Sequence, residues 1–145
     1  MGYQLSRTTA DDIFKQLKKD YRIFAPMVFP GEGCYSDTDV IRYGEAETLQ
    51  DIEFERKSDY SFKEALFPIN ETLFYFTEEE TSVPALPDKG ILIFLRSCDI
   101  HALKRLDSIY LNNDPEDFYY KRLREKAKFV LIGCSSTCAN GFCAS

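Results

Sequence analysis

The sequence predicts an α/β fold (mixed α+β), a small sheet with a parallel strand–helix–strand unit that carries cysteines at the carboxyl ends of its strands. Residues 91–95 and 129–132 are apolar throughout, which is typical of strands covered on both faces. Apolar residues recur at helical spacing between these runs, so a helical crossover would connect two neighbouring parallel strands. Cys98 closely follows the first run and Cys134 the second.

The crossover is expected to contain two helices. The first begins near Cys98, and its apolar residues are Ile100, Leu103, Leu106, Ile109 and Tyr110. Residues 112–115 interrupt the pattern, and the second helix is expected to begin there, with Asp114 as N-cap and Pro115 as its first residue. The apolar face of the second helix is predicted to consist of Phe118, Tyr119, Leu123 and Ala127.

The first half of the chain shows a weaker pattern. A helix is expected with Thr9 as its N-cap, followed by an extended segment at residues 22–29 that is broken at Pro26. Residues 40–43 predict a strand and residues 52–54 a weaker one.

An aromatic-rich region follows at residues 60–76 and leads into an acidic, proline-containing linker. The favoured interpretation is a core layer beneath a long loop. The alternative is that part of this region covers the cysteines or faces a partner protein.

Length and composition limit the protein class. With 145 residues, the chain predicts one domain, 1–145, with subdomains 1–88 and 89–145 as a possible division. The net charge of −6 argues against a nucleic-acid partner. No apolar run approaches the length of a membrane span and no secretion signal opens the chain, so a cytoplasmic location is expected.

Four of the five cysteines are predicted to meet at one place. Parallel neighbouring strands would bring Cys98 and Cys134 to the same edge of the sheet, and the following loop can fold Cys138 and Cys143 over it. Four thiolates suit an iron–sulfur cluster or a structural zinc ion, whereas unrelated buried thiols are the third interpretation. The spacing C-x3-C-x4-C in the loop decides between none of them.

Other reactive residues give little sign of catalysis. Cys34 is expected to be an unpaired thiol, and His101, the single histidine, a surface residue of its helix or a donor to a sulfur atom. A lone histidine argues against a hydrolase triad, and no glycine-rich phosphate loop is present. Arg96 and Arg105 would add positive potential near the thiols. No catalytic residue is predicted.

Residues 95–107 resemble the signature R-x-C-D-x-x-x-x-x-R-L-D of the anaerobic sulfite reductase family, in its electron-transfer subunits. The iron–sulfur beta subunits of soluble NiFe hydrogenases (sulfhydrogenases) are similar there. The likeness continues through residues 119–124, 129–134 and 140–143, the last of which reads N-G-F-C where the family usually has N-C-F-C. Upstream, the stretches that favour the sulfite reductase branch are residues 36–39, 42–44, 67–69 and 71–74.

This resemblance implies an electron-transfer subunit of an NAD(P)H-linked anaerobic sulfite reductase. Such a subunit relays electrons through a [4Fe–4S] cluster from a flavin- and NAD(P)H-binding subunit to a sirohaem catalytic subunit. Cys98, Cys134 and Cys143 match family positions as iron ligands. Cys138 is assigned as the fourth ligand by proximity, because Gly141 stands where relatives often carry cysteine.

The chain departs from the family by lacking the ferredoxin run C-x2-C-x2-C-x3-C-P. An N-terminal fragment without the C-terminal ferredoxin-like domain is therefore expected. Two alternative functions remain. One is an electron-transfer beta subunit of a soluble NiFe hydrogenase; the other is a structural or zinc-binding domain that docks partner subunits.

Overall fold

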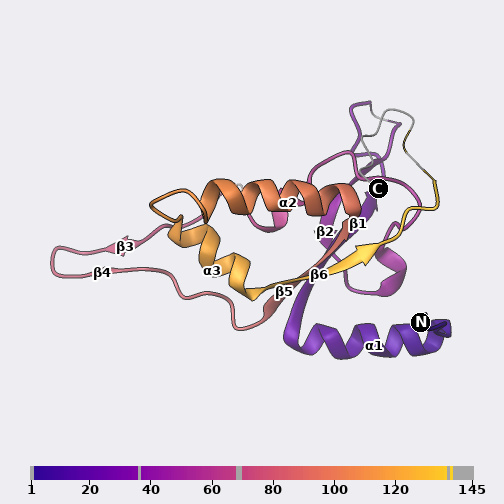
Figure 1. Ribbon diagram of the computed structural model, residues 1–145, viewed down its shortest axis with the longest axis horizontal. Helices are drawn as coiled ribbons and strands as arrows, with labels where there is room; N and C mark the ends of the chain where they lie inside the picture. The colour runs from indigo at the N-terminus through magenta and orange to yellow at the C-terminus, as the bar shows by residue number, and fades with distance from the viewer. Residues whose placement is uncertain (1, 36, 68–69, 137, 139–145) are drawn as a thin grey trace.

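A four-stranded sheet in the order β2-β1-β5-β6 forms the centre of the protein (Figure 1). The structure, a computed structural model, describes residues 2–35, 37–67, 70–136 and 138. Strand β2 runs antiparallel to β1, whereas β1, β5 and β6 are parallel, so the predicted fold class and the parallel strand–helix–strand unit are confirmed. The strands of this sheet are β1 (Tyr21–Phe29), β2 (Val40–Glu45), β5 (Gly90–Arg96) and β6 (Ala127–Ile132).

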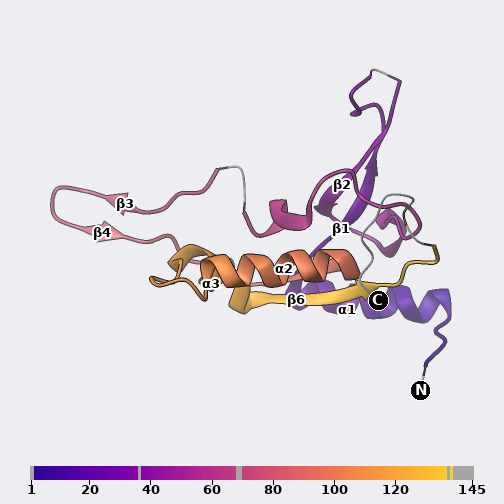
Figure 2. The ribbon, with the colours of Figure 1, turned by 45° about the horizontal axis from the view of Figure 1, so that its top comes forward.

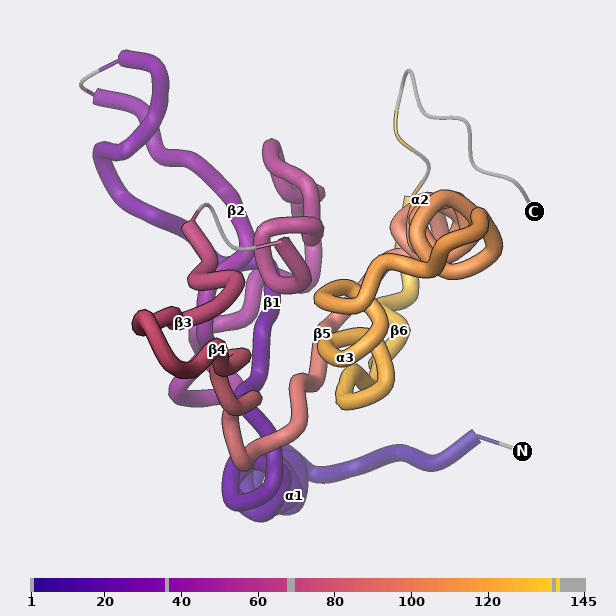
Figure 3. The backbone as a smooth tube through the Cα atoms, turned by 90° about the vertical axis from the view of Figure 1, so that its left-hand side faces the viewer, coloured from indigo at the N-terminus to yellow at the C-terminus, as the bar shows by residue number. Residues whose placement is uncertain are grey.

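Helices cover both faces of the sheet, and Figure 3 shows α1 lying apart from α2 and α3. The helices are α1 (Arg7–Asp20), α2 (Ser97–Tyr110) and α3 (Phe118–Lys126), with single 3₁₀ turns η1 (Leu49–Asp51) and η2 (Phe62–Ala65). None of the helices in the described ranges combines the length and the apolar character needed to cross a lipid bilayer.

Strand β5 joins two hydrophobic clusters because its side chains alternate between the faces of the sheet. Ile91, Ile93 and Leu95 pack in the cluster that contains α2 and α3. Leu92 and Phe94 pack in the cluster that contains α1. The continuous apolar run therefore reflects burial on both faces, as the sequence predicts.

Two helices begin at residues other than those predicted. The N-cap of α1 is Ser6, whose hydroxyl accepts a hydrogen bond from the backbone of Thr9 at 3.2 Å. The N-cap of α3 is Asp117 rather than Asp114, and its carboxylate accepts from the backbone of Tyr120 at 2.8 Å. In both cases several residues in the sequence have capping side chains, and a different one caps the helix.

The buried residue of α3 is Tyr120, which is 1% exposed, and not Phe118, which is 52% exposed and was predicted for the apolar face. The Tyr120 ring stacks on Phe67 with centroids 5.2 Å apart, and its hydroxyl donates to Asp107 of α2 at 2.7 Å. Arg124 donates to the same carboxylate at 2.9 and 3.0 Å. Burial opposes ionisation of Asp107, but the hydrogen bonds from Arg124 and Tyr120 outweigh it and lower its pKa.

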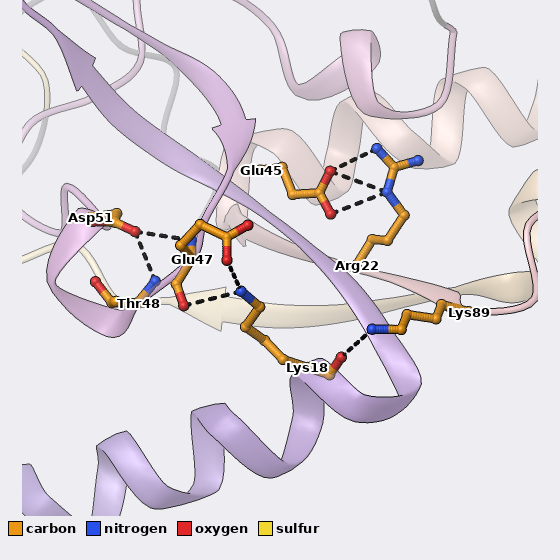
Figure 4. Close-up of polar contacts among 7 residues, drawn as sticks. All are labelled: Lys18, Arg22, Glu45, Glu47, Thr48, Asp51 and Lys89. Carbon is orange, nitrogen blue, oxygen red and sulfur yellow. Dashed lines mark hydrogen bonds and ion pairs between the residues drawn. The ribbon is translucent and has the colours of Figure 1, made fainter.

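Polar contacts connect the end of α1 to the first two strands (Figure 4). Arg22 of β1 and Glu45 of β2 form a fork of hydrogen bonds at 2.7 to 3.1 Å, and this contact raises the pKa of Arg22 and lowers that of Glu45. Lys18 pairs with Glu47, and Lys89, just before β5, donates to the Lys18 carbonyl at 2.8 Å. These contacts hold α1 against the end of the sheet where β1 and β5 begin.

The aromatic-rich region divides into a buried and an exposed part. Phe62 is fully buried and Phe67 packs against the same cluster, as predicted for a core layer. The chain then extends into a long hairpin in which β3 (Tyr75–Phe76) pairs with β4 (Thr81–Ser82), away from the sheet (Figure 2). For its exposed members the core prediction is wrong; these are Leu73, Phe74, Tyr75 and Phe76. Residues 52–54, predicted as a weak strand, form none.

The β5–β6 pair offers a matched test of the core. Leu95 and Leu131 are register partners, but Leu95 is 0% exposed and Leu131 is 59% exposed. Leu95→Ala is expected to lower the free energy of unfolding by about 2–5 kcal/mol, because it leaves a cavity. Leu131→Ala is expected to cost less than about 1 kcal/mol. Chemical denaturation of both variants measures the difference, and equal losses would contradict the described burial.

Candidate functional site

The candidate site lies where β5 and β6 end side by side. Arg96 and Ile132 are the last register pair of these strands, and Cys98 and Cys134 each follow two residues later. Cys98 is the second residue of α2 and half-buried, whereas Cys134 is exposed in the segment after β6. Parallel pairing thus brings together two thiols that are distant in the sequence.

The environment of Cys98 disfavours its free thiolate. Burial first, and then the neighbouring Asp99 carboxylate and the Cys134 thiol, raise the pKa of Cys98 above the ordinary value. Lys57 acts in the opposite direction. The start of α2 adds free backbone N–H groups and a partial positive charge, which suit a sulfur whose negative charge is shared with a metal ion.

Arg96 connects this edge of the sheet to the first half of the chain. Its side chain is buried although it carries a positive charge, and the residue is 5% exposed. One terminal nitrogen donates to Cys134 Sγ at 3.3 Å, and the other donates to the carbonyl oxygens of Phe54 and Arg56 at 2.7 and 2.9 Å. Its Nε is buried without a hydrogen-bond partner among the described residues. A cationic donor next to sulfur stabilises negative charge on that sulfur.

Asp99 fixes the start of α2 against the sheet. Its carboxylate accepts from the backbone N–H of Arg96 at 3.2 Å and from the hydroxyl of Tyr43 at 3.3 Å. Burial and the Asp99 charge together raise the pKa of Tyr43, which keeps this hydroxyl protonated as a donor. Tyr43, Arg96 and Asp99 line a small cavity of about 220 Å³ with Lys57 and Ser58.

The other predicted ligands are placed only in part. Cys138 is exposed in the loop beyond Cys134, and Cys143 lies outside the described residues. Within the described ranges, no three His, Cys, Asp or Glu side chains are grouped so that they hold a metal ion. The four-cysteine ligand set therefore stays a prediction. Cys34 lies exposed between β1 and β2, and His101 is exposed on α2.

The contacts of Arg96 were not predicted from the sequence, which suggested only that it adds positive potential. Its bonds to Phe54 and Arg56 span about 40 residues of sequence. An arginine at the end of an unbroken apolar strand is the signal that indicates a buried charge, because such a residue needs internal acceptors.

The chain is similar to sulfhydrogenase 2 subunit beta of Pyrococcus furiosus, with 27% identity over 124 residues. The match covers 85% of this chain and 34% of that protein, so the chain spans about a third of the length of the curated relative it matches. No family model matches the chain, and no solved structure is significantly similar to it. The resemblance to sulfhydrogenase beta subunits is thereby confirmed at the level of weak similarity.

The hydrogen bonds of Arg96 can be tested by its replacement. Arg96→Met removes the donors to Phe54 and Arg56, so we expect a loss of about 3 kcal/mol in unfolding free energy. Faster amide hydrogen exchange in residues 53–57 should accompany the loss, because this segment is then released. Arg42→Met, which changes an exposed arginine of β2, serves as the control. Similar effects of the two variants on residues 53–57 would refute this role of Arg96.

Proposed function

We propose that the chain is part of an electron-transfer subunit that holds an iron–sulfur cluster. The observation that carries the proposal is the meeting of Cys98 and Cys134 at the ends of neighbouring parallel strands, with Arg96 donating a hydrogen bond to Cys134. The similarity to the beta subunit of a sulfhydrogenase supports the same class of protein. The role proposed for the chain is a one-electron relay, with substrate chemistry on another subunit.

The residues described at this edge of the sheet fit such a group. Cys98 and Cys134 would supply two thiolates, and Cys138 and Cys143 are proposed as the other two ligands. When bound, a [4Fe–4S] cluster supplies one-electron redox chemistry. The chain itself positions the sulfur atoms on two strand ends and stabilises their negative charge through Arg96 and the start of α2. The unpartnered Nε–H of Arg96 leaves a further donor at this site.

Two electron-transfer complexes are candidates for the whole protein. The signature at residues 95–107 favours an NAD(P)H-linked anaerobic sulfite reductase, in which the electron donor is a flavin- and NAD(P)H-binding subunit and the acceptor is a sirohaem subunit. The similarity to a sulfhydrogenase protein favours a soluble NiFe hydrogenase equally. We retain the sulfite reductase as the proposal and the hydrogenase as its alternative. Both would operate in the cytoplasm under anaerobic conditions.

Anaerobic reconstitution with iron and sulfide tests the cluster. We expect about four iron and four sulfide per chain, with broad absorption near about 400 nm. Cys98→Ser and Cys134→Ser should lose this absorption, because each removes a proposed ligand. Cys34→Ser is the matched control and should retain it, since Cys34 lies in the loop between β1 and β2.

The same preparation separates the cluster from zinc. Stoichiometric zinc with no iron in protein purified without oxygen would favour the structural alternative and rule out the relay. Cys138→Ser should reduce the iron content as Cys98→Ser does. If Cys138→Ser matches Cys34→Ser instead, Cys138 is not a ligand.

The two candidate complexes are separated by purification of the tagged protein from its source cells without oxygen. A sulfite reductase is expected to yield co-purified sirohaem and viologen-dependent reduction of sulfite to sulfide. A hydrogenase would instead yield nickel and viologen-dependent evolution of hydrogen. Nickel with no sirohaem would overturn the sulfite reductase assignment and leave the iron–sulfur relay in place.

A further inference from the structure

An open groove runs along the outward face of α2 and begins at Cys98. It has a volume of about 810 Å³. Cys98, His101, Ala102, Arg105 and Ile109 lie at spacings of three and four residues along the helix, so they form one continuous stripe. The stripe is about 16 Å long at 1.5 Å per helical residue. The remaining residues that line the groove are Lys63, Lys104 and Leu106.

The carboxylates of α2 are held away from this groove. Asp99 accepts hydrogen bonds from the Arg96 backbone and the Tyr43 hydroxyl at the sheet. Asp107 accepts two from Arg124 of α3. These are the two acidic residues of the helix, and neither neutralises the basic side chains on its outward face.

The basic side chains at the groove are therefore available to another molecule. Lys63, Lys104 and Arg105 are exposed, and within the described ranges none of them forms an ion pair. None of the described residues lining the groove is acidic, although the chain as a whole carries a net charge of −6. Positive charge is thus concentrated beside Cys98 on an otherwise acidic protein.

Apolar surface lies between these charges. Ile109 is 56% exposed and Leu106, at 7%, forms part of the floor of the groove. An apolar strip with a cationic rim is typical of surfaces that bind a partner weakly and reversibly, since the charges guide the encounter and the strip is buried on contact. Small, electrostatically steered interfaces of this kind serve transient redox complexes.

We propose that this groove docks an acidic electron-carrier protein against α2, beside Cys98. The proposal rests on the proposed electron-transfer function and adds the location and the chemistry of the partner surface. Charge complementarity selects the occupant: the partner presents carboxylates to Lys63, Lys104 and Arg105 around an apolar centre that contacts Ile109. The groove begins at Cys98, so the docked protein lies next to one of the two thiols at the sheet edge.

Binding can be measured with a purified acidic ferredoxin as the probe and this protein with or without iron. Isothermal titration at about 10 mM ionic strength should show micromolar affinity, and about 500 mM salt should weaken it at least tenfold by screening. The double variant Lys104→Glu/Arg105→Glu should weaken binding at least tenfold. Lys15→Glu/Lys19→Glu makes the same change of net charge on α1, at the other face of the sheet, and should change the affinity less than twofold.

Amide chemical-shift changes on titration locate the contact. They are expected on α2 and at Lys63 of η2, and a basic probe such as cytochrome c should cause none. Absence of ferredoxin binding, equal effects of the two double variants, or shifts confined to the β3–β4 hairpin would each overturn the docking proposal. So would self-association that Lys104→Glu/Arg105→Glu abolishes. None of these outcomes depends on the cluster, whereas failure of iron incorporation alone would overturn the proposed function.

Discussion

The parallel pairing of β5 with β6 is the constraint on which the candidate site depends. Six register pairs, from Ile91 and Ala127 to Arg96 and Ile132, bring both strands to an end at the same edge of the sheet. The register is held by the core, because a slip of one residue in β5 would exchange the side chains packed against α1 with those packed against α2 and α3. The approach of Cys98 and Cys134 is therefore a property of the packed sheet, and the loop after Cys134 does not need to create it.

Arg96 couples that edge to the rest of the chain. A buried guanidinium is costly unless its donors find acceptors, and here the acceptors are two carbonyl groups of residues 54 and 56 and the sulfur of Cys134. The segment after η1 is thus held against the end of β5. Because Asp99 ties the start of α2 to Tyr43 as well, the chain on both sides of Cys98 is anchored to β2 or to the segment that follows it. The thiols therefore lie on a rigid support, which suits a group that must keep its geometry while its charge changes.

The sequence was most informative where burial and periodicity agree. Strand β5 and helix α2 followed from the apolar residues at 91–95 and from Leu103 and Leu106, all of which are buried. Local signals were less decisive: several residues near each helix start have capping side chains, and packing of Tyr120 accompanies the choice of Asp117 for α3. Apolar character also could not reveal that Leu131 is exposed, because position within the sheet determines that. Of the site, the sequence predicted the meeting of Cys98 and Cys134, but the acceptors of Arg96 are long-range contacts without a local pattern.

The β3–β4 hairpin has a consequence for how the molecule opens. Two register pairs join its strands, and a two-stranded hairpin is marginally stable in water by itself. Its described anchors lie near its base on α3, where Tyr119 donates to the carbonyl of Leu73 at 2.8 Å and Arg122 to that of Pro84 at 3.0 Å. The hairpin is thus a separate cooperative unit that opens at much lower free energy than the sheet. A protease that cuts aromatic sites would nick the native protein at Phe74–Phe76 first and leave β5, β6 and both thiols in place.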